Sequence, residues 1–131
     1  MGNGLMCQRR VALVTGAGRG IGRCTALTLA REGAAVAVNY LQDDVGATEL
    51  VERIVARGGK AVAIRADVYA PDDCRRLVAE ATQSLGPIDI CIVSPGAGWR
   101  MGPVHELDPA SAAEDVRREV APLFALLPLL L

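Results

Sequence analysis

The chain has 131 residues, of which 51% are hydrophobic and 22% are charged, and its formal net charge at pH 7 is −1. This length and composition predict one globular domain and exclude an intrinsically disordered chain. The near-neutral charge and the 3% share of aromatic residues argue against nucleic-acid binding, which uses clustered cations and aromatic stacking platforms.

Cysteine and histidine placement predicts no metal site. The four cysteines show no CxxC spacing and His105 is the only histidine, whereas zinc ligands come in closely spaced pairs. The N-terminus has no apolar stretch of signal-peptide length, and the apolar tail 123–131 is too short to cross a bilayer. We therefore expect a cytoplasmic protein with free thiols, neither exported nor held in a membrane.

Four short apolar runs predict strands that are covered on both faces, because polar residues do not alternate with the apolar ones. These runs are residues 11–14, 34–38, 61–64 and 90–93. Between them lie segments with helical periodicity that end at glycines, residues 21–32, 43–57 and 71–85. Strands that alternate with helices predict an α/β fold, a doubly wound parallel sheet with helices on both faces.

A last helix is predicted to begin with Asp108 as N-cap and Pro109 at its first position, and to continue to Leu131. Its end is apolar, whereas chain termini are usually polar and frayed. We expect an N-terminal extension over residues 1–8 and a nucleotide-binding domain over residues 9–131. That domain looks incomplete, cut off after the fourth strand and the helix that follows it.

A glycine-rich segment, TGAGRGIG at residues 15–22, directly follows the first strand and opens the first helix. Gly16 permits a tight turn, Gly20 lets a phosphate approach the backbone, and Gly22 lets the helix pack closely on the strand. The helix N-terminus adds free N–H groups and the positive end of its dipole. The spacing is GxxxGxG and neither register of a P-loop fits it. This pattern predicts a dinucleotide site, with a glycine turn that binds no ligand as the alternative.

This segment resembles TGxxxGIG, the cofactor motif of the short-chain dehydrogenase/reductase family. The agreement continues through AVAVNY, AIRADV and IDICIV, and the VNY ending is similar to the 3-oxoacyl-carrier-protein reductase branch. The resemblance covers residues 9–131. It implies a Rossmann-like fold, a nicotinamide cofactor, and hydride transfer involving a small-molecule carbonyl or alcohol substrate. The implied cofactor contacts in the turn are Gly16, Gly18, Arg19, Gly20, Ile21 and Gly22.

Charge at the end of the second strand favours NADP over NAD, although NAD remains possible. Enzymes that choose NAD need an acid there to hold the ribose 2′-hydroxyl, but this chain has Asn39 followed by Tyr40. Arg19 could bring a permanently charged guanidinium to the 2′-phosphate. The alternative is that Arg19 is a solvated loop residue.

Positions after the third and fourth strands extend the resemblance. Asp67, followed by Val68, matches the family residue whose carboxylate meets the adenine amino group, and a turn-forming acid is the alternative. The family's NNAG segment is replaced by a sequence in which Ser94 and Gly96 are the expected cofactor contacts. Gly96 keeps the close backbone approach that the nicotinamide ribose requires, while the paired amides are missing. Trp99 is interpreted as a surface residue rather than a cover for the nicotinamide.

The catalytic residues that the resemblance implies are absent. The family has an asparagine early in the long helix, where this chain has Glu119 or Arg118, depending on the alignment. Neither tyrosine is followed by lysine four residues on, and His105 is interpreted as solvated. We therefore expect the cofactor-binding half of a reductase, with a non-catalytic dinucleotide-binding module or a structural remnant as alternatives. Open sheet edges and the leucine-rich last helix favour association, so we expect a homo-oligomer.

Overall fold

A computed structural model describes residues 4–94, 96 and 101–131 of the chain. Trp99 lies outside the described residues. The strands are β1 (Val11–Val14), β2 (Ala35–Tyr40), β3 (Ala61–Arg65) and β4 (Ile90–Ile92). The helices are α1 (Gly20–Arg31), α2 (Asp44–Val55), α3 (Pro71–Leu85) and α4 (Pro109–Leu130), with a short 3-10 helix η1 (Val104–Glu106) before α4. The predicted elements differ from these only at their ends.

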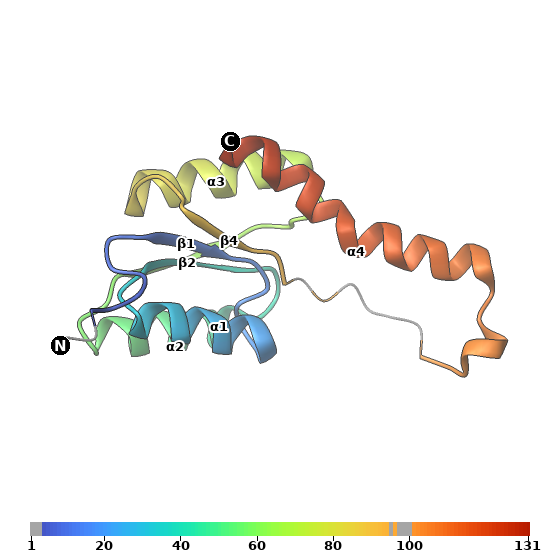
Figure 1. The fold of residues 1–131 in the computed structure, drawn as a ribbon, viewed down its shortest axis with the longest axis horizontal. Helices are drawn as coiled ribbons and strands as arrows, with labels where there is room; N and C mark the ends of the chain where they lie inside the picture. Colours follow the sequence, from blue (N-terminus) through green and yellow to red (C-terminus); the bar gives the residue numbers. More distant parts are fainter. Residues whose placement is uncertain (1–3, 95, 97–100) are drawn as a thin grey trace.

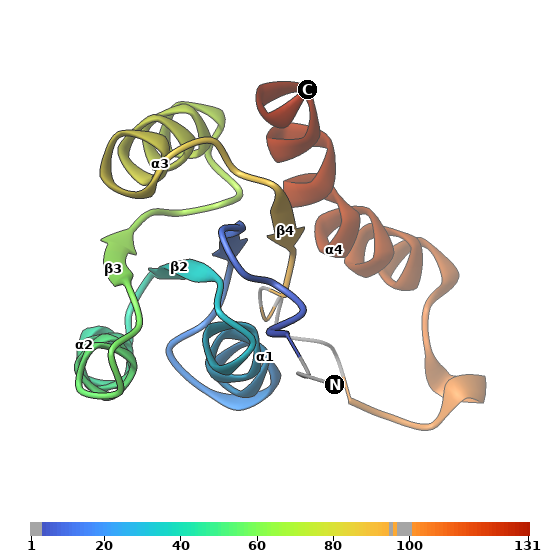
Figure 2. The ribbon, with the colours of Figure 1, turned by 60° about the vertical axis from the view of Figure 1, so that its left-hand side comes forward.

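The strands form one parallel sheet in the order β3-β2-β1-β4. Val11 pairs with Ala35 across β1 and β2, and Val36 pairs with Ala61 across β2 and β3. Helices α1 and α2 cover one face of the sheet, and α3 and α4 cover the other (Figure 1 and Figure 2). The predicted doubly wound, Rossmann-like fold is therefore confirmed, with β3 and β4 at the two edges of the sheet.

The hydrophobic core lies on both faces of the sheet, because successive side chains of a strand point to opposite faces. Ala12 and Val14 belong to the cluster under α1 and α2, whereas Leu13 between them belongs to the cluster under α3 and α4. The first cluster also contains Ala26, Val36, Val38, Leu50 and Ile54, and the second contains Ala37, Ile64, Leu77, Ala81 and Leu126. Both faces of β1 are thus buried, as its uninterrupted apolar sequence predicts.

Helix α4 differs from the other three in how little of its apolar surface is covered. It begins as predicted, with the Asp108 carboxylate accepting a hydrogen bond from the Ser111 N–H at 2.8 Å. Leu126 is buried against the second core cluster, but Phe124 is 70% exposed and Leu127 is 45% exposed. No helix in the described part of the chain is long and apolar enough to cross a membrane.

Candidate functional site

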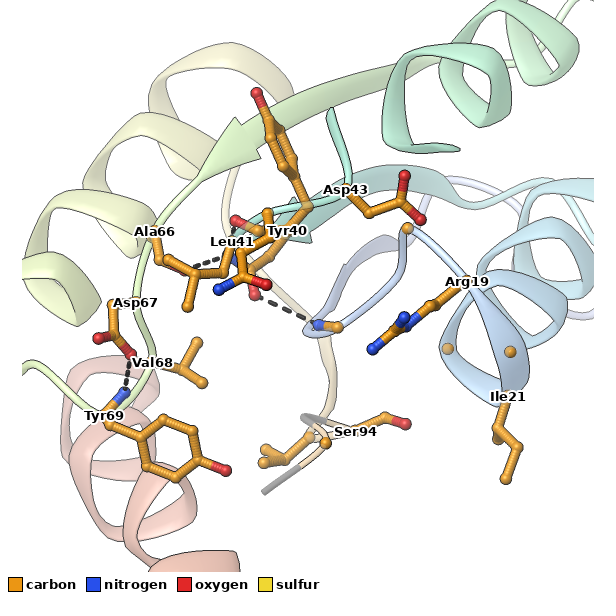
Figure 3. A pocket seen from close by; sticks show the side chains of 18 of the residues that line it. Arg19, Ile21, Tyr40, Leu41, Asp43, Ala66, Asp67, Val68, Tyr69 and Ser94 are labelled. Carbon is orange, nitrogen blue, oxygen red and sulfur yellow. Dashed lines mark hydrogen bonds between the residues drawn. The ribbon is translucent and has the colours of Figure 1, made fainter. Parts of the chain in front are cut away.

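A cavity of about 930 Å³ opens at the carboxyl ends of the strands, above the turn that joins β1 to α1 (Figure 3). The strand order reverses at β1, and open parallel sheets bind ligands at such a switch point. The cavity lining includes every cofactor contact expected from the sequence, namely Gly16, Gly18, Arg19, Gly20, Ile21, Gly22, Asn39, Tyr40, Asp67, Val68, Ser94 and Gly96. It also includes Leu41, Gln42, Asp43, Ala66, Tyr69, Val93 and Glu119. None of these seven residues was predicted as a cofactor contact, although Ala66 and Val93 lie in the AIRADV and IDICIV segments and Glu119 was considered at the catalytic asparagine position.

The glycine turn has the backbone geometry that its sequence predicts. Gly16 and Gly20 have φ angles of 60° and 58°, in the left-handed region that favours glycine. A Cβ atom at Gly20 would meet nothing within 4 Å, so the backbone there is open to an approaching group. The first N–H groups of a helix have no intrahelical partner. At the start of α1, the side chain of the N-cap residue Arg19 makes no capping hydrogen bond. This helix start can therefore hold an anion.

Gly22 acts differently from the expectation that it lets the helix pack on the strand. A Cβ atom at this position would lie 2.5 Å from the carbonyl oxygen of Gly16 and 3.2 Å from the Cα of Ala17. The glycine is therefore required by the turn itself, which folds back onto the first residues of α1. Sequence spacing cannot distinguish packing of the helix on the strand from packing of the helix on the turn, because both need a residue without a side chain.

Asn39 lines the cavity, but its side-chain amide is bonded to the protein backbone. It is 2% exposed, its Nδ2 donates to the carbonyl oxygens of Ile64 at 3.3 Å and Ala66 at 3.1 Å, and its Oδ1 accepts from the Gly16 N–H at 3.3 Å. The amide thus ties the glycine turn to the end of β3. Tyr40 and the three residues after it extend the end of β2 along the cavity.

Thr15 ties the same turn to the β4 side. Its buried hydroxyl oxygen accepts a hydrogen bond from the Ser94 N–H at 2.9 Å, and its own N–H donates to the Ile92 carbonyl at 2.9 Å. The paired amides of the family's NNAG segment are missing here, yet the backbone after β4 is still fixed to the turn. Ser94 contributes its main chain to this contact.

The turn also touches the start of α2. The Asp43 carboxylate accepts from the Gly46 N–H at 2.9 Å and so caps this helix. Arg23 Nη1 donates to the carbonyl oxygens of Gly46 at 2.6 Å and Gly18 at 3.3 Å. A Cβ atom at Gly46 would lie 2.4 Å from the Gly18 carbonyl oxygen, so the two backbones are in close contact. The sequence patterns did not predict this contact between the glycine turn and α2.

Asp67 forms the turn that the sequence offered as one alternative, and its contact with adenine stays a prediction. Its Oδ1 accepts from the Tyr69 N–H at 2.9 Å, which is the turn expected of such an acid, and the residue also lines the cavity. The Asp67 N–H donates to Asp73 Oδ2 at 2.8 Å. This backbone hydrogen bond, together with a side-chain hydrogen bond from Arg76, holds the pKa of the Asp73 carboxyl below its usual value.

Among the residues that the structure describes, Tyr69 Oη and Glu119 Oε2 in the cavity wall are buried and have no hydrogen-bond partner. Burial raises the pKa of the Tyr69 phenol, and the charge of Glu119 raises it further. A buried polar group without a hydrogen bond lowers the free energy of unfolding by about 1–3 kcal/mol. Such a group in a cavity wall therefore calls for an explanation, such as a bound ligand or water. Neither residue was predicted as a cofactor contact.

His105 lies away from the cavity in η1, and its side chain is 82% exposed beside Glu106. Within residues 4–94, 96 and 101–131, no three histidine, cysteine, aspartate or glutamate side chains gather where they could hold a metal ion. The described residues that line the cavity present backbone N–H groups, the Arg19 guanidinium and a few oxygen-bearing side chains.

The parallel sheet, the glycine turn at a helix N-terminus and the cavity at the switch point define a dinucleotide-binding α/β fold. The profile of the short chain dehydrogenase family matches residues 10–129. The chain belongs to this family.

Individual relatives agree with this assignment. An uncharacterised oxidoreductase of Methylorubrum extorquens is 47% identical over 87 residues, which are 66% of this chain and 35% of that protein. Versicolorin reductase 1 of Aspergillus parasiticus is 48% identical over 89 residues, 68% of this chain and 33% of that protein. The chain thus spans about a third of the length of these curated relatives.

Solved structures show the same architecture. A dehydrogenase/reductase of Sinorhizobium meliloti superposes with a TM-score of 0.83 at 34% identity, over 95% of this chain and 49% of that one. A blue fluorescent protein from a metagenomic library, solved in complex with NADPH, gives a TM-score of 0.78 at 32% identity, over 94% of this chain and 50% of that one. The chain corresponds to about half of each structure.

Proposed function

We propose that this chain binds NADP(H) and forms the cofactor-binding half of a reductase that transfers hydride between nicotinamide and a small-molecule carbonyl or alcohol. The twelve cofactor contacts expected from the sequence gather in one cavity at the switch point of the sheet, and this gathering carries the proposal. The α1 N-terminus and the open backbone at Gly20 would hold the pyrophosphate. Nicotinamide supplies the hydride when it is bound. The NADPH complex of the metagenomic relative supports the same cofactor class.

Gly20→Asp tests the phosphate site. The new carboxylate would stand against the pyrophosphate, on backbone with a φ of 58° that aspartate adopts at a cost. Calorimetric titration with NADPH should show at least a tenfold loss of affinity, or ~1.4 kcal/mol. Gly102→Asp is the control, because a Cβ atom there meets nothing within 4 Å and the residue lies outside the cavity. Unchanged NADPH binding in a folded Gly20→Asp variant would sink the assignment.

We propose that Arg19 attracts the 2′-phosphate of NADP(H). The end of β2 has no acidic residue that would repel this phosphate. Asn39→Asp is a poor test of this idea, since a carboxylate would face the carbonyl oxygens of Ile64 and Ala66 and lose their hydrogen bonds. Tyr40→Asp places the acid at the last residue of β2, beside the cavity. Combined with Arg19→Ala, it should shift the ratio of the NADPH and NADH dissociation constants toward NADH. An unchanged ratio would refute the selection.

Hydride transfer is proposed for the whole reductase and not for these 131 residues alone. No tyrosine in the sequence is followed by lysine four residues later, so no family-type proton donor is positioned for a developing alkoxide. NADPH oxidation with a panel of ketones should stay at background while calorimetry detects NADPH binding. Ser and Tyr-x-x-x-Lys encoded downstream of Leu131 support the reductase, whereas a stop codon there supports a non-catalytic dinucleotide-binding module.

Self-association is proposed to use α4. Phe124 and Leu127 expose apolar side chains on this helix, and such patches favour association. Sedimentation velocity should detect a homo-oligomer that a Phe124→Ser, Leu127→Ser double variant weakens. A wild-type monomer at all accessible concentrations would contradict the expected homo-oligomer.

A further inference from the structure

A second cavity lies at the opposite edge of the sheet from the candidate cofactor site, where the strands begin. Its volume is about 640 Å³, within the range of about 300–1,000 Å³ that small-molecule sites occupy. It is lined by the first residues of β1 and β2, the end of α1, the loop between α2 and β3, and the turn before β1. Helices α1 and α2 lie side by side on this face of the sheet (Figure 2).

The lining of this cavity is strongly basic, although the net charge of the chain is −1. None of the described residues that line it is acidic, and five are cationic, namely Arg9, Arg10, Arg31, Arg57 and Lys60. Arg10 pairs with Asp89 at 3.0 Å, and no carboxylate of the described chain forms an ion pair with the other four. Cations that are scattered along the sequence are thus gathered by the fold and left without counter-charges.

Cations near helix ends have a simpler explanation, because they complement the negative end of the helix dipole. At both helix ends, however, the backbone already supplies donors to the last carbonyl oxygens. The Gly33 N–H donates to the Ala30 carbonyl of α1 at 3.0 Å. The Gly59 N–H donates to the Ile54 carbonyl of α2 at 3.1 Å. In the described part of the chain, Arg10 is the one cation of this cavity whose side chain makes a hydrogen bond, so the cations do not cap the helices.

Backbone strain holds Arg9 at the edge of this cavity. Its φ angle is 65°, in the left-handed region that residues other than glycine rarely adopt. Before Arg9, the Cys7 N–H donates to the Glu32 carbonyl at 2.9 Å. After it, the Arg10 carbonyl accepts from the Ala35 N–H at 2.9 Å, so the turn is fixed on both sides. Strained backbone persists where the surrounding structure imposes it, and it is concentrated at binding sites.

The chemistry of this lining fits a ligand with several negative charges. Guanidinium groups bind phosphate oxygens through paired hydrogen bonds, and apolar side chains of Leu27, Ile54 and Leu85 lie in the same lining. We propose that the second cavity binds a small organic polyphosphate, with its phosphate oxygens on the cations and its organic part on the apolar residues. This binding does not depend on the proposed cofactor site, because the described linings of the two cavities share no residue.

Calorimetric titration of the 131-residue chain with ATP and with inorganic tripolyphosphate tests this proposal. ATP should bind more tightly, because only ATP has an organic part to contact the apolar lining. Arg57→Gln and Arg9→Asn should each weaken ATP binding about fivefold, ~1 kcal/mol, and asparagine is chosen because it tolerates the left-handed backbone. Arg53→Gln is the matched control and should change nothing, since Arg53 is exposed in the last turn of α2 but does not line the cavity.

Two further measurements separate this site from the cofactor cavity and from a structural role. Gly20→Asp should keep the ATP binding that Arg57→Gln weakens, whereas Arg57→Gln should keep NADPH binding. The ligand-free melting temperature of Arg57→Gln should stay the same or rise, because removing one of several like charges reduces their repulsion. The proposal is overturned if the wild type shows no saturable ATP binding, if tripolyphosphate binds as tightly as ATP, or if Arg53→Gln weakens ATP binding as much as Arg57→Gln. Loss of ATP binding in Gly20→Asp would place ATP in the cofactor cavity and overturn it too.

Discussion

The β1–β2 side of the molecule and the α4 side differ in how much of their apolar surface is buried. All four residues of β1 are buried, and the glycine turn above it is braced by Asn39, Thr15 and the start of α2. All three residues of β4 are only partly buried, and α4 exposes several large apolar side chains. The phosphate end of the cavity is therefore fixed within the chain itself. Cofactor binding can be tested on this chain, whereas its α4 wall has surfaces that remain uncovered.

The largest contrast is expected inside α4. Leu126 is 1% exposed and its neighbour Leu127 is 45% exposed. Leu126→Ala should lower the free energy of unfolding by about 2–5 kcal/mol, because it leaves a cavity in the core. Leu127→Ala should cost less than about 1 kcal/mol in a monomer, as surface changes do. Urea unfolding measures both, and equal losses would mean that α4 packs with both leucines covered.

Glycine substitutions test how tightly the glycine turn on the β1–β2 side is packed. Gly22→Ala forces a Cβ atom to within 2.5 Å of the Gly16 carbonyl oxygen, so the turn must shift. We expect a loss of about 1–3 kcal/mol in unfolding free energy, the usual cost of overpacking, together with weaker NADPH binding. Gly4→Ala, where a Cβ atom meets nothing within 4 Å, should change neither. Retained stability and affinity in Gly22→Ala would show that the turn is not tightly packed.

The Asn39 and Thr15 side chains should contribute unequally to the stability of the glycine turn. Asn39→Ala leaves the Gly16 N–H and two carbonyl oxygens without their partner, and we expect a cost of about 1–3 kcal/mol. Thr15→Val removes one acceptor from the partly exposed Ser94 and should cost about 0.5–1.5 kcal/mol. Chemical denaturation with matched fits ranks the two. If Thr15→Val lowers the free energy of unfolding more than Asn39→Ala does, then the hydrogen bond to Ser94 is the stronger of the two contacts.

The smallest expected effect is the pH dependence of the melting temperature that comes from Asp89, which contacts the start of β1. Hydrogen bonds from the Val11 N–H and from Arg10 hold the pKa of the Asp89 carboxyl below its ordinary value of 3.8. A lowered pKa in the folded state means that this stabilisation is present above the unfolded value and is lost as pH falls through the folded one. Melting temperature should therefore drop below about pH 4, and Asp89→Asn should drop less steeply. Asp73, whose pKa is lowered too, should keep part of the slope in that variant. Identical slopes in wild type and variant would contradict the role of Asp89.

Sequence alone determined the elements, their order and the place of the cofactor turn. Uninterrupted apolar runs predicted β1 and β2 because strands buried on both faces need no polar alternation. Gly16 and Gly20 were predictable because a left-handed turn strongly favours residues without a side chain. These signals are local in the chain, so they do not depend on what packs against them. The expected cofactor contacts all reached one cavity for the same reason, since parallel strands bring their carboxyl ends to one edge.

Only the tertiary structure decided which atoms the side chains at that edge of the sheet contact. Asn39 turns its amide toward β3 and the glycine turn, because one residue along a strand changes the face on which a side chain lies. Gly22 packs on the turn, and Gly46 of α2 packs on Gly18, through contacts between segments that no local pattern relates. Tyr69, which follows β3, and Glu119 of α4 line one cavity although they are far apart in the sequence. Periodicity predicts that a residue is buried, but which atoms it meets depends on the packing of elements far apart in sequence.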